Sequence, residues 1–102
     1  MFTIKQNNTL YSLEVILSGT ESLVGAQIFF SMMDATGKVV IDRANAQIVD
    51  LVERLAVYDW ASGDTAVPGL YRGEFEVLFS NGDRLTYPNG DYIPIRIVKA
   101  IP

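Results

Sequence analysis

Residues 71–79 read Tyr-Arg-Gly-Glu-Phe-Glu-Val-Leu-Phe, and this stretch decides the fold class. Every second residue from Tyr71 to Phe79 is aromatic, aliphatic or glycine, and the residues between them are mostly polar. Successive side chains of a β-strand point to opposite faces, so the first set is expected in a core and the second mostly in water. The stretch is therefore predicted to be a half-buried β-strand.

The residues that follow predict a hairpin. Asn81 and Gly82 both adopt positive φ readily, as a two-residue type I′ turn requires. We therefore expect residues 84–87 to return beside the first strand. Farther on, isoleucines alternate with other residues over 93–98, and Pro94 lies among them. Because proline cannot donate a ladder hydrogen bond, this last strand is predicted at a sheet edge, at least on that side.

Similar runs of β-branched and aromatic residues fill the rest of the chain, separated by short clusters of Asn, Asp, Gly and Ser. This spacing is typical of a sandwich or barrel of short antiparallel strands. The 102 residues fit one domain without an internal boundary, and 49% hydrophobic residues are ample for a core. We predict a single all-β domain over residues 1–102.

The segment Asp50–Trp60 is ambiguous. Asp50 with Glu53 three residues later matches a helix capping pattern, and apolar residues recur here with helical spacing. Alternation from Leu55 to Trp60 suits a strand equally well. Since the neighbouring segments are all β, we favour a turn at 51–53 followed by a strand.

Apolar side chains on nominally outward faces are the candidate contact residues. Residues 26–33 carry large apolar groups at both alternating sets of positions, which indicates a strand buried on both sides. The second cover is either a loop of the same chain or a neighbouring subunit. The apolar members of outward faces are Phe29, Met33, Ile16 and Leu78.

Composition excludes several functions. The chain has no Cys and no His, which removes thiolate nucleophiles, disulfides, Cys/His zinc sites and His-dependent triads. A net charge of −4 and a pI near 4.5 have the wrong sign for nucleic-acid binding. No apolar stretch is long enough for a membrane span, and the first residues do not form a secretory signal. We therefore expect a protein of the cytoplasm, or of a particle assembled there.

No catalytic, metal-binding or cofactor-binding residue is predicted. Glu74 and Glu76 share one strand face at a spacing that inverting glycosidases use, but any half-exposed strand produces such pairs. Asp59, Ser62 and Asp64 could offer oxygen atoms to calcium, yet the EF-hand pattern is absent and turn formation explains them. The domain is therefore expected to be non-enzymatic.

A carbohydrate-binding surface is the alternative that the aromatic residues allow. Tyr and Trp rings stack on the apolar faces of sugars, although most aromatic residues of so small a domain belong to its core. Such a module would present these rings on one exposed flat face. The candidates are Trp60, Tyr58, Tyr87 and Tyr92.

Several stretches resemble the N-terminal domain of phage baseplate upper proteins. The resemblance covers nearly the whole chain and is carried by loose motifs in a particular order and spacing. They are 4–10 (IKQNNTL), 24–32 (VGAQIFFSM), 58–65 (YDWASGDT), 68–77 (PGLYRGEFEV), 81–83 (NGD) and 87–92 (YPNGDY).

The resemblance implies an immunoglobulin-like β-sandwich of about seven to nine strands and a role in phage tail or baseplate assembly. It implies contacts with copies of the chain itself or with other tail proteins, and hence a homo-oligomer in a virion. Tyr71 is expected to form a tyrosine corner, and Trp60 to supply core bulk in place of a disulfide. Baseplate upper proteins continue beyond this domain whereas this chain stops at Pro102, so a small connector or accessory subunit is expected.

Overall fold

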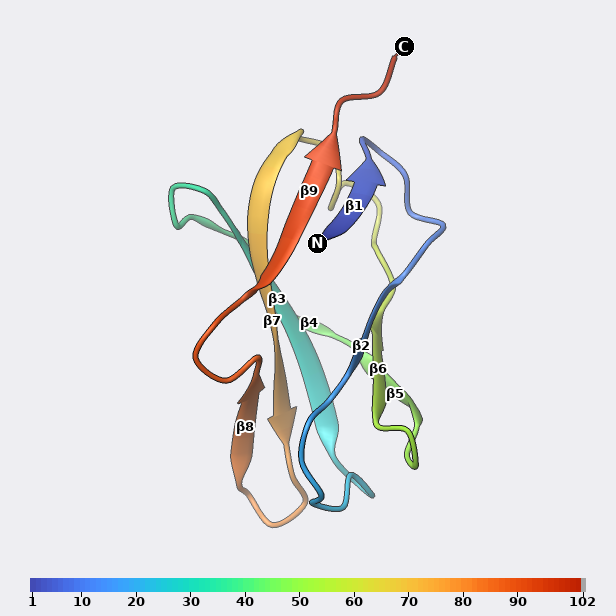
Figure 1. Cartoon of the computed structure of the whole chain (residues 1–102), viewed down its shortest axis with the longest axis vertical. Coiled ribbons are helices and arrows are strands. Elements are labelled where there is room, and N and C mark those ends of the chain that lie inside the picture. The colour runs from blue at the N-terminus through green and yellow to red at the C-terminus, as the bar shows by residue number, and fades with distance from the viewer. Residues whose placement is uncertain (102) are drawn as a thin grey trace.

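The computed structural model describes residues 1–101, which form nine strands and no helix. No described segment is therefore a helix that could cross a membrane. Figure 1 shows β1 and β9 side by side at one end of the molecule and the β7–β8 hairpin at the other. The bounds are β1 Phe2–Lys5, β2 Leu13–Ile16, β3 Gln27–Asp34, β4 Val39–Asn45, β5 Gln47–Asp50, β6 Leu55–Tyr58, β7 Gly69–Leu78, β8 Arg84–Tyr87 and β9 Ile93–Val98.

The strands form two sheets. The large sheet has the order β1-β9-β7-β3-β4, with β8 also paired to β7, and the small sheet has the order β2-β6-β5. The prediction of an all-β sandwich is confirmed. The prediction that all its strands are antiparallel is wrong for one pair, because β1 runs parallel to β9, with Phe2 beside Ile95 and Lys5 beside Val98. This pairing joins residues near the two ends of the chain, and local periodicity does not report it.

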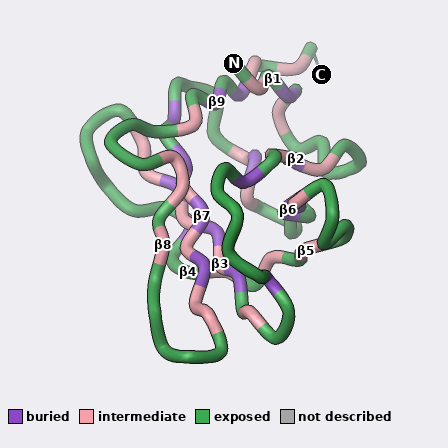
Figure 2. Tube along the Cα trace, turned by 60° about the horizontal axis from the view of Figure 1, so that its bottom comes forward, coloured by how far each residue is buried: buried purple, intermediate pink, exposed green. Residues whose placement is uncertain are grey.

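The alternation predicted for the central strand is present. Tyr71, Gly73, Phe75 and Val77 of β7 are buried, whereas the residues between them are half-buried or exposed. Figure 2 shows the same contrast along the whole trace, with burial concentrated in the strands and exposure in the loops. Residues 26–33 likewise lie almost entirely in β3, the neighbour of β7.

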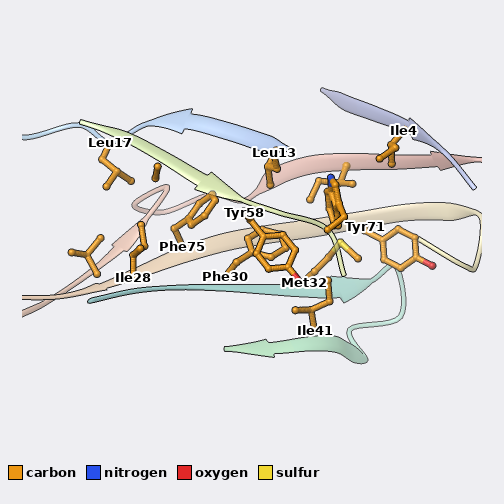
Figure 3. Packing of buried hydrophobic residues seen from close by; sticks show 14 of the residues in the cluster. Ile4, Leu13, Leu17, Ile28, Phe30, Met32, Ile41, Tyr58, Tyr71 and Phe75 are labelled. Atoms are coloured by element: carbon orange, nitrogen blue, oxygen red, sulfur yellow. The ribbon is translucent and has the colours of Figure 1, made fainter. Parts of the chain in front are cut away.

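Aromatic rings fill the space between the sheets. Tyr58 of β6 stacks on Phe30 of β3 with 4.5 Å between ring centroids, as Figure 3 shows. Trp60 meets Phe30 edge-on at 5.9 Å and Tyr58 at 5.4 Å, and Phe75 lies 5.2 Å from Phe30. Offset and edge-on pairs of this kind add about 0.5–1.5 kcal/mol each beyond the burial of their area. The core is thus held across the layers without a disulfide.

The ambiguous segment is a turn followed by a strand. One oxygen of Asp50 accepts hydrogen bonds from the backbone amides of Val52 and Glu53, at 3.0 and 2.9 Å. Arg54 then adopts a left-handed conformation with φ of 59°, and β6 begins at Leu55. Asp50 therefore caps the backbone as the sequence pattern predicts, but it caps a single turn and not a helix. The left-handed conformation of Arg54 ends the turn after one round.

The β7–β8 hairpin exists, but its predicted turn type is wrong. Only Gly82 has positive φ, at 94°. The amide of Gly82 donates to the carbonyl of Phe79, and the amide of Phe79 donates to the carbonyl of Asp83. This is a three-residue loop, in which a type I turn is followed by one left-handed residue that forms a bulge. Such a loop needs glycine at one position only.

The prediction of an edge position for the last strand is also wrong. Strand β9 lies between β1 and β7. Pro94 is nevertheless tolerated, because the β1 pairing begins only at Ile95. Pro94 itself is opposite Arg72 of β7 and has no β1 residue on its other side. The proline constraint therefore holds for one residue and not for the whole strand.

A side-chain hydrogen bond fixes the approach to β7. The Tyr71 hydroxyl donates to the carbonyl of Val67, four residues upstream, at 2.6 Å. This is the geometry that defines a tyrosine corner.

Gly73 provides the sharpest test of the packing between β7, β3 and β9. A Cβ atom added there would lie 2.8 Å from Phe30 Cε1 and 2.9 Å from Ile95 Cδ1. We expect Gly73→Ala to lower the free energy of unfolding by about 1–3 kcal/mol in urea denaturation, because overpacking forces side chains off their rotamers. In a Phe30→Leu background, which removes the ring, the same substitution should cost at least about 1 kcal/mol less. An equal cost in both backgrounds would contradict this packing.

Candidate interaction surface

The outer face of the small sheet carries apolar side chains on all three of its strands. Pairing places Ile16 beside Leu55 and Gln47 beside Val57, on the side opposite the core residues Leu13, Ala56 and Tyr58. Ile16 is 61% exposed and Val49 is 53% exposed. Val57 is buried yet does not belong to the core cluster, since it lies between neighbouring strands on the outside. We call Ile16, Val49, Leu55 and Val57 the small-sheet face.

An open groove of about 430 Å³ continues this face beyond the end of the sheet. It lies between the loop that follows β2 and the β5–β6 turn. Its apolar lining is contributed by Leu23 and Val24 on one side and by Leu51 and Val52 on the other. Val52 is 90% exposed. The groove thus adds apolar residues at one end of the small-sheet face, on which Glu14 and Gln47 lie beside Val57 and Asp50 lies opposite Leu55.

Arg54 holds the wall of the groove in place. Its Nε donates to the carbonyl of Leu17 at 3.0 Å, and its Nη2 donates to that of Ser18 at 3.1 Å. Its Nη1 donates to the carbonyl of Glu21. The main chain adds a bond from the Leu17 amide to the Arg54 carbonyl. One guanidinium thus binds three carbonyls of the loop after β2 and holds that loop against the start of β6.

Acidic residues surround the small-sheet face. Glu14 projects from β2 beside Val57, and Asp59 follows β6. One Asp59 oxygen accepts a hydrogen bond from Ser12, and the other accepts one from Gln47 at 3.4 Å. Asp50, at the end of β5 opposite Leu55, and Glu53, in the β5–β6 turn, are both exposed. An apolar centre with a charged rim is the usual composition of a protein-binding patch.

The structure does not bring the four predicted contact residues together. Ile16 lies on the small-sheet face, whereas Phe29, Met33 and Leu78 lie on the outer face of the large sheet. The Arg43 guanidinium covers the Phe29 ring at 4.5 Å from its centroid. For Phe29, therefore, the second cover comes from the same chain. That any of the four contacts a neighbour stays a prediction.

Met33 and Leu78 are both half-buried. Met33 is opposite Val39 and lines a cavity of about 60 Å³ together with Tyr92. Leu78 is opposite Arg84 and Gln27.

Sequence reasoning missed Val49, Leu51 and Leu55. The available signal was the same one that singled out β3: residues 55–58 are apolar at both alternating sets of positions. It was overlooked because the helix alternative competed for the same residues.

Two of the acidic residues that were considered for chemistry, Glu76 and Asp64, make structural contacts. Glu76 lies 2.6 Å from an Arg43 guanidinium nitrogen and 3.9 Å from one of Arg84. Asp64 accepts hydrogen bonds from the Tyr58 hydroxyl at 2.5 Å and the Ala61 amide at 2.8 Å. Residues 1–101 contain no group of three or more Asp or Glu side chains arranged to hold a metal ion.

The groups whose pKa values are shifted are two buried tyrosines and one aspartate in a turn. Burial raises the pKa of the Tyr58 phenol well above its usual value, and its hydrogen bond to Asp64 acts in the same direction. Burial, followed by the nearby charge of Asp34, raises the pKa of Tyr71. The hydroxyl of Thr36, followed by the Lys38 amide, lowers the pKa of Asp34. None of these groups lies on the small-sheet face.

The aromatic residues do not form a sugar-binding platform. Trp60 is 5% exposed and Tyr58 is 3% exposed, and both pack on Phe30 in the core. The Trp60 indole nitrogen is buried without a hydrogen-bond partner among the described residues. Tyr87 is half-buried against the same core, and the Arg72 guanidinium lies over the ring of Tyr92, which is 41% exposed. The four candidates therefore do not share one exposed flat face, and the alternative of a carbohydrate-binding module is not supported.

Comparison with solved structures finds CopC from Methylosinus trichosporium OB3b. The two chains superpose with a TM-score of 0.58 at 18% identity, over 99% of this chain and 86% of CopC. CopC is an immunoglobulin-like β-sandwich, and the predicted fold class is confirmed. No protein-family model matches this chain, and no curated protein does.

The resemblance to phage baseplate upper proteins is corrected by this result. The structural neighbour is CopC and not a phage protein, and no family model supports the resemblance. The assignment to a tail or baseplate particle is withdrawn with it. The motifs that carried the resemblance are mostly turn and strand-start residues, and any sandwich with loops of similar length reproduces them.

Removal of the Arg54 side chain tests how the groove is held. We expect Arg54→Ala to lower the free energy of unfolding by about 1–3 kcal/mol, because hydrogen bonds from a charged donor to three carbonyls are lost. Arg84→Ala is the matched control, since Arg84 is 63% exposed and should change stability by less than about 0.5 kcal/mol. Urea denaturation measures both. Equal effects would show that the three carbonyls gain nothing from Arg54.

Proposed function

We propose that this chain is a non-enzymatic β-sandwich module that associates with further copies of itself through the small-sheet face. The observation that carries the proposal is the apolar surface formed by Ile16, Val49 and Leu55 and extended by Leu51 and Val52. Soluble proteins rarely leave a cluster of exposed apolar side chains on three adjacent strands unless something covers it. Burial of that surface contributes about 25 cal/mol per Å², from which the entropic cost of association is subtracted.

The residues of this chain do not support the function of CopC. CopC is a copper-handling protein. Copper sites in proteins are built from imidazole, thiolate and thioether ligands. This chain has no His and no Cys, and of its three methionines Met32 is buried in the core, Met33 is half-buried on the other side of the same strand, and Met1 is exposed at the start of the chain. Its residues therefore do not fit such a site, and the likeness supports the fold alone.

Sedimentation velocity over a concentration series from about 10 µM to 1 mM tests the proposal. We expect the weight-average sedimentation coefficient of the wild-type chain to rise with concentration. Val49→Lys should weaken self-association at least about tenfold, which corresponds to about 1.4 kcal/mol, because it places a charge in the buried contact.

Val39→Lys is the matched control, because Val39 is 56% exposed on a strand of the other sheet. It should leave the association unchanged. A wild-type chain that stays monomeric throughout the series, or equal effects of the two variants, would overturn the proposal.

A further inference from the structure

A second surface, on the opposite side of the molecule, is basic. Outward-facing residues of β1, β9 and β7 include Lys5, Arg96 and Arg72, and register places Arg96 between Thr3 and Leu70. Lys99 follows directly after β9. Leu70 is 56% exposed at the centre of this group. We call Lys5, Leu70, Arg72 and Arg96 the basic corner.

The charges of the basic corner are not neutralised within the described part of the chain. The ion pairs there join Arg43 and Arg84 to Glu76, and Arg54 to Glu21. None involves Lys5, Arg72 or Arg96. Arg72 instead lies over the ring of Tyr92, at 5.4 Å from its centroid. Among residues 1–101, then, Lys5, Arg72 and Arg96 have no ion-pair partner, and they can meet carboxylates of another molecule.

Charge is divided unequally between the two layers. The small-sheet side, comprising residues 7–26 and 46–68, carries six carboxylates and a single cation, Arg54. That cation is occupied by backbone carbonyls. The remaining segments carry seven cations and six carboxylates. The overall charge of −4 is thus distributed unevenly: the small-sheet side is strongly acidic, and the basic corner lies on the other side.

We infer that the small-sheet face of one copy docks on the basic corner of the next copy. This inference rests on the proposed function and names its partner surface. Glu14 and Asp59 would approach Lys5 and Arg96 while the apolar residues cover Leu70. Each surface thus offers an apolar centre and a charged rim of the sign that the other requires.

A symmetric contact between two small-sheet faces is disfavoured by the same charges. It would bring Glu14, Asp50, Glu53 and Asp59 of one copy against the same four residues of the other. Like charges held together across an interface cost several kcal/mol. Because the two sheets pack through their inner faces, the small-sheet face and the basic corner point in opposite directions. The contact is therefore head-to-tail, and it can be repeated from copy to copy.

A mixing experiment tests the arrangement. Ile16→Lys disables the small-sheet face, because it places a cation against the cations of the basic corner, and the double variant Lys5→Glu with Arg96→Glu disables the basic corner. In a head-to-tail contact each variant alone is monomeric, but their mixture forms a 1:1 heterodimer and nothing larger, because one intact copy of each surface remains. Sedimentation velocity separates these species, and circular dichroism melting verifies that each variant is folded. Lys38→Glu, in the β3–β4 turn, is the control for a reversed charge elsewhere and should associate like the wild type.

Each other outcome has one meaning. If the Lys5/Arg96 double variant associates as strongly as the wild type, the head-to-tail inference fails and the proposed function stands. If both variants are monomeric and their mixture is also monomeric, these two surfaces do not meet and the inference fails. If the wild-type chain itself never associates, the proposed function fails first. When the surfaces do meet, an increase in sodium chloride from 50 to 500 mM should weaken wild-type association at least about fivefold, because salt screens exposed charge pairs.

Discussion

The stacking of Tyr58 on Phe30 across the two sheets is the interaction on which the rest of the structure depends. The chain has no disulfide to join its layers, so this pair, with Trp60 and Phe75 around it, supplies the contact that keeps them face to face. Gly73 leaves the space that the Phe30 ring occupies. With these aromatic residues committed to the interior, the outer face of the small sheet is built from aliphatic, polar and charged side chains.

The two outer faces differ in chemistry because different strands supply them. The small sheet has only three strands, and its middle strand is apolar on both sides, so its outer face remains apolar at Leu55 and Val57. The large sheet covers Phe29 with Arg43 and pairs Arg43 with Glu76, which leaves its uncompensated cations at the β1–β9 end. This asymmetry between two faces of one rigid sandwich makes a head-to-tail contact the natural mode of association. The hydrogen bonds of Arg54 hold the loop after β2 against the start of β6, on the acidic side of the molecule.

The sequence predicted what depends on local periodicity. Alternation in residues 71–79 identified the central strand, and the capping pattern at Asp50 identified a turn. Sequence-based prediction failed for features that are set by residues far away in the chain, namely the turn type of the hairpin and the position of the last strand in its sheet. The Asn81-Gly82 pair suits more than one turn, and the register of β7 against β8 selects the three-residue loop. Pro94 indicated an edge, because nothing local shows that β1 pairs with β9 in parallel from Ile95 onward.

The candidate surface was harder to predict than the fold. Ile16 stood out because it interrupts a polar face, but its neighbours Leu55 and Val49 join it only through pairing between strands. Phe29 looked equally exposed in the sequence, and its cover comes from Arg43 on the neighbouring strand. Local reasoning therefore identifies apolar residues on outward faces, whereas the three-dimensional arrangement decides which of them remain uncovered.

The central claim is that the small-sheet face and the basic corner are the two halves of one contact. Two-dimensional ¹H–¹⁵N NMR spectra of the wild-type chain along a dilution series test it most directly. The account predicts that amide signals around Ile16 and Val49 shift together with those around Lys5, Leu70 and Arg96, with one common concentration dependence, while those of Asn81 and Gly82 stay fixed. Shifts confined to the small-sheet face, or a spectrum that does not change with concentration, would contradict it.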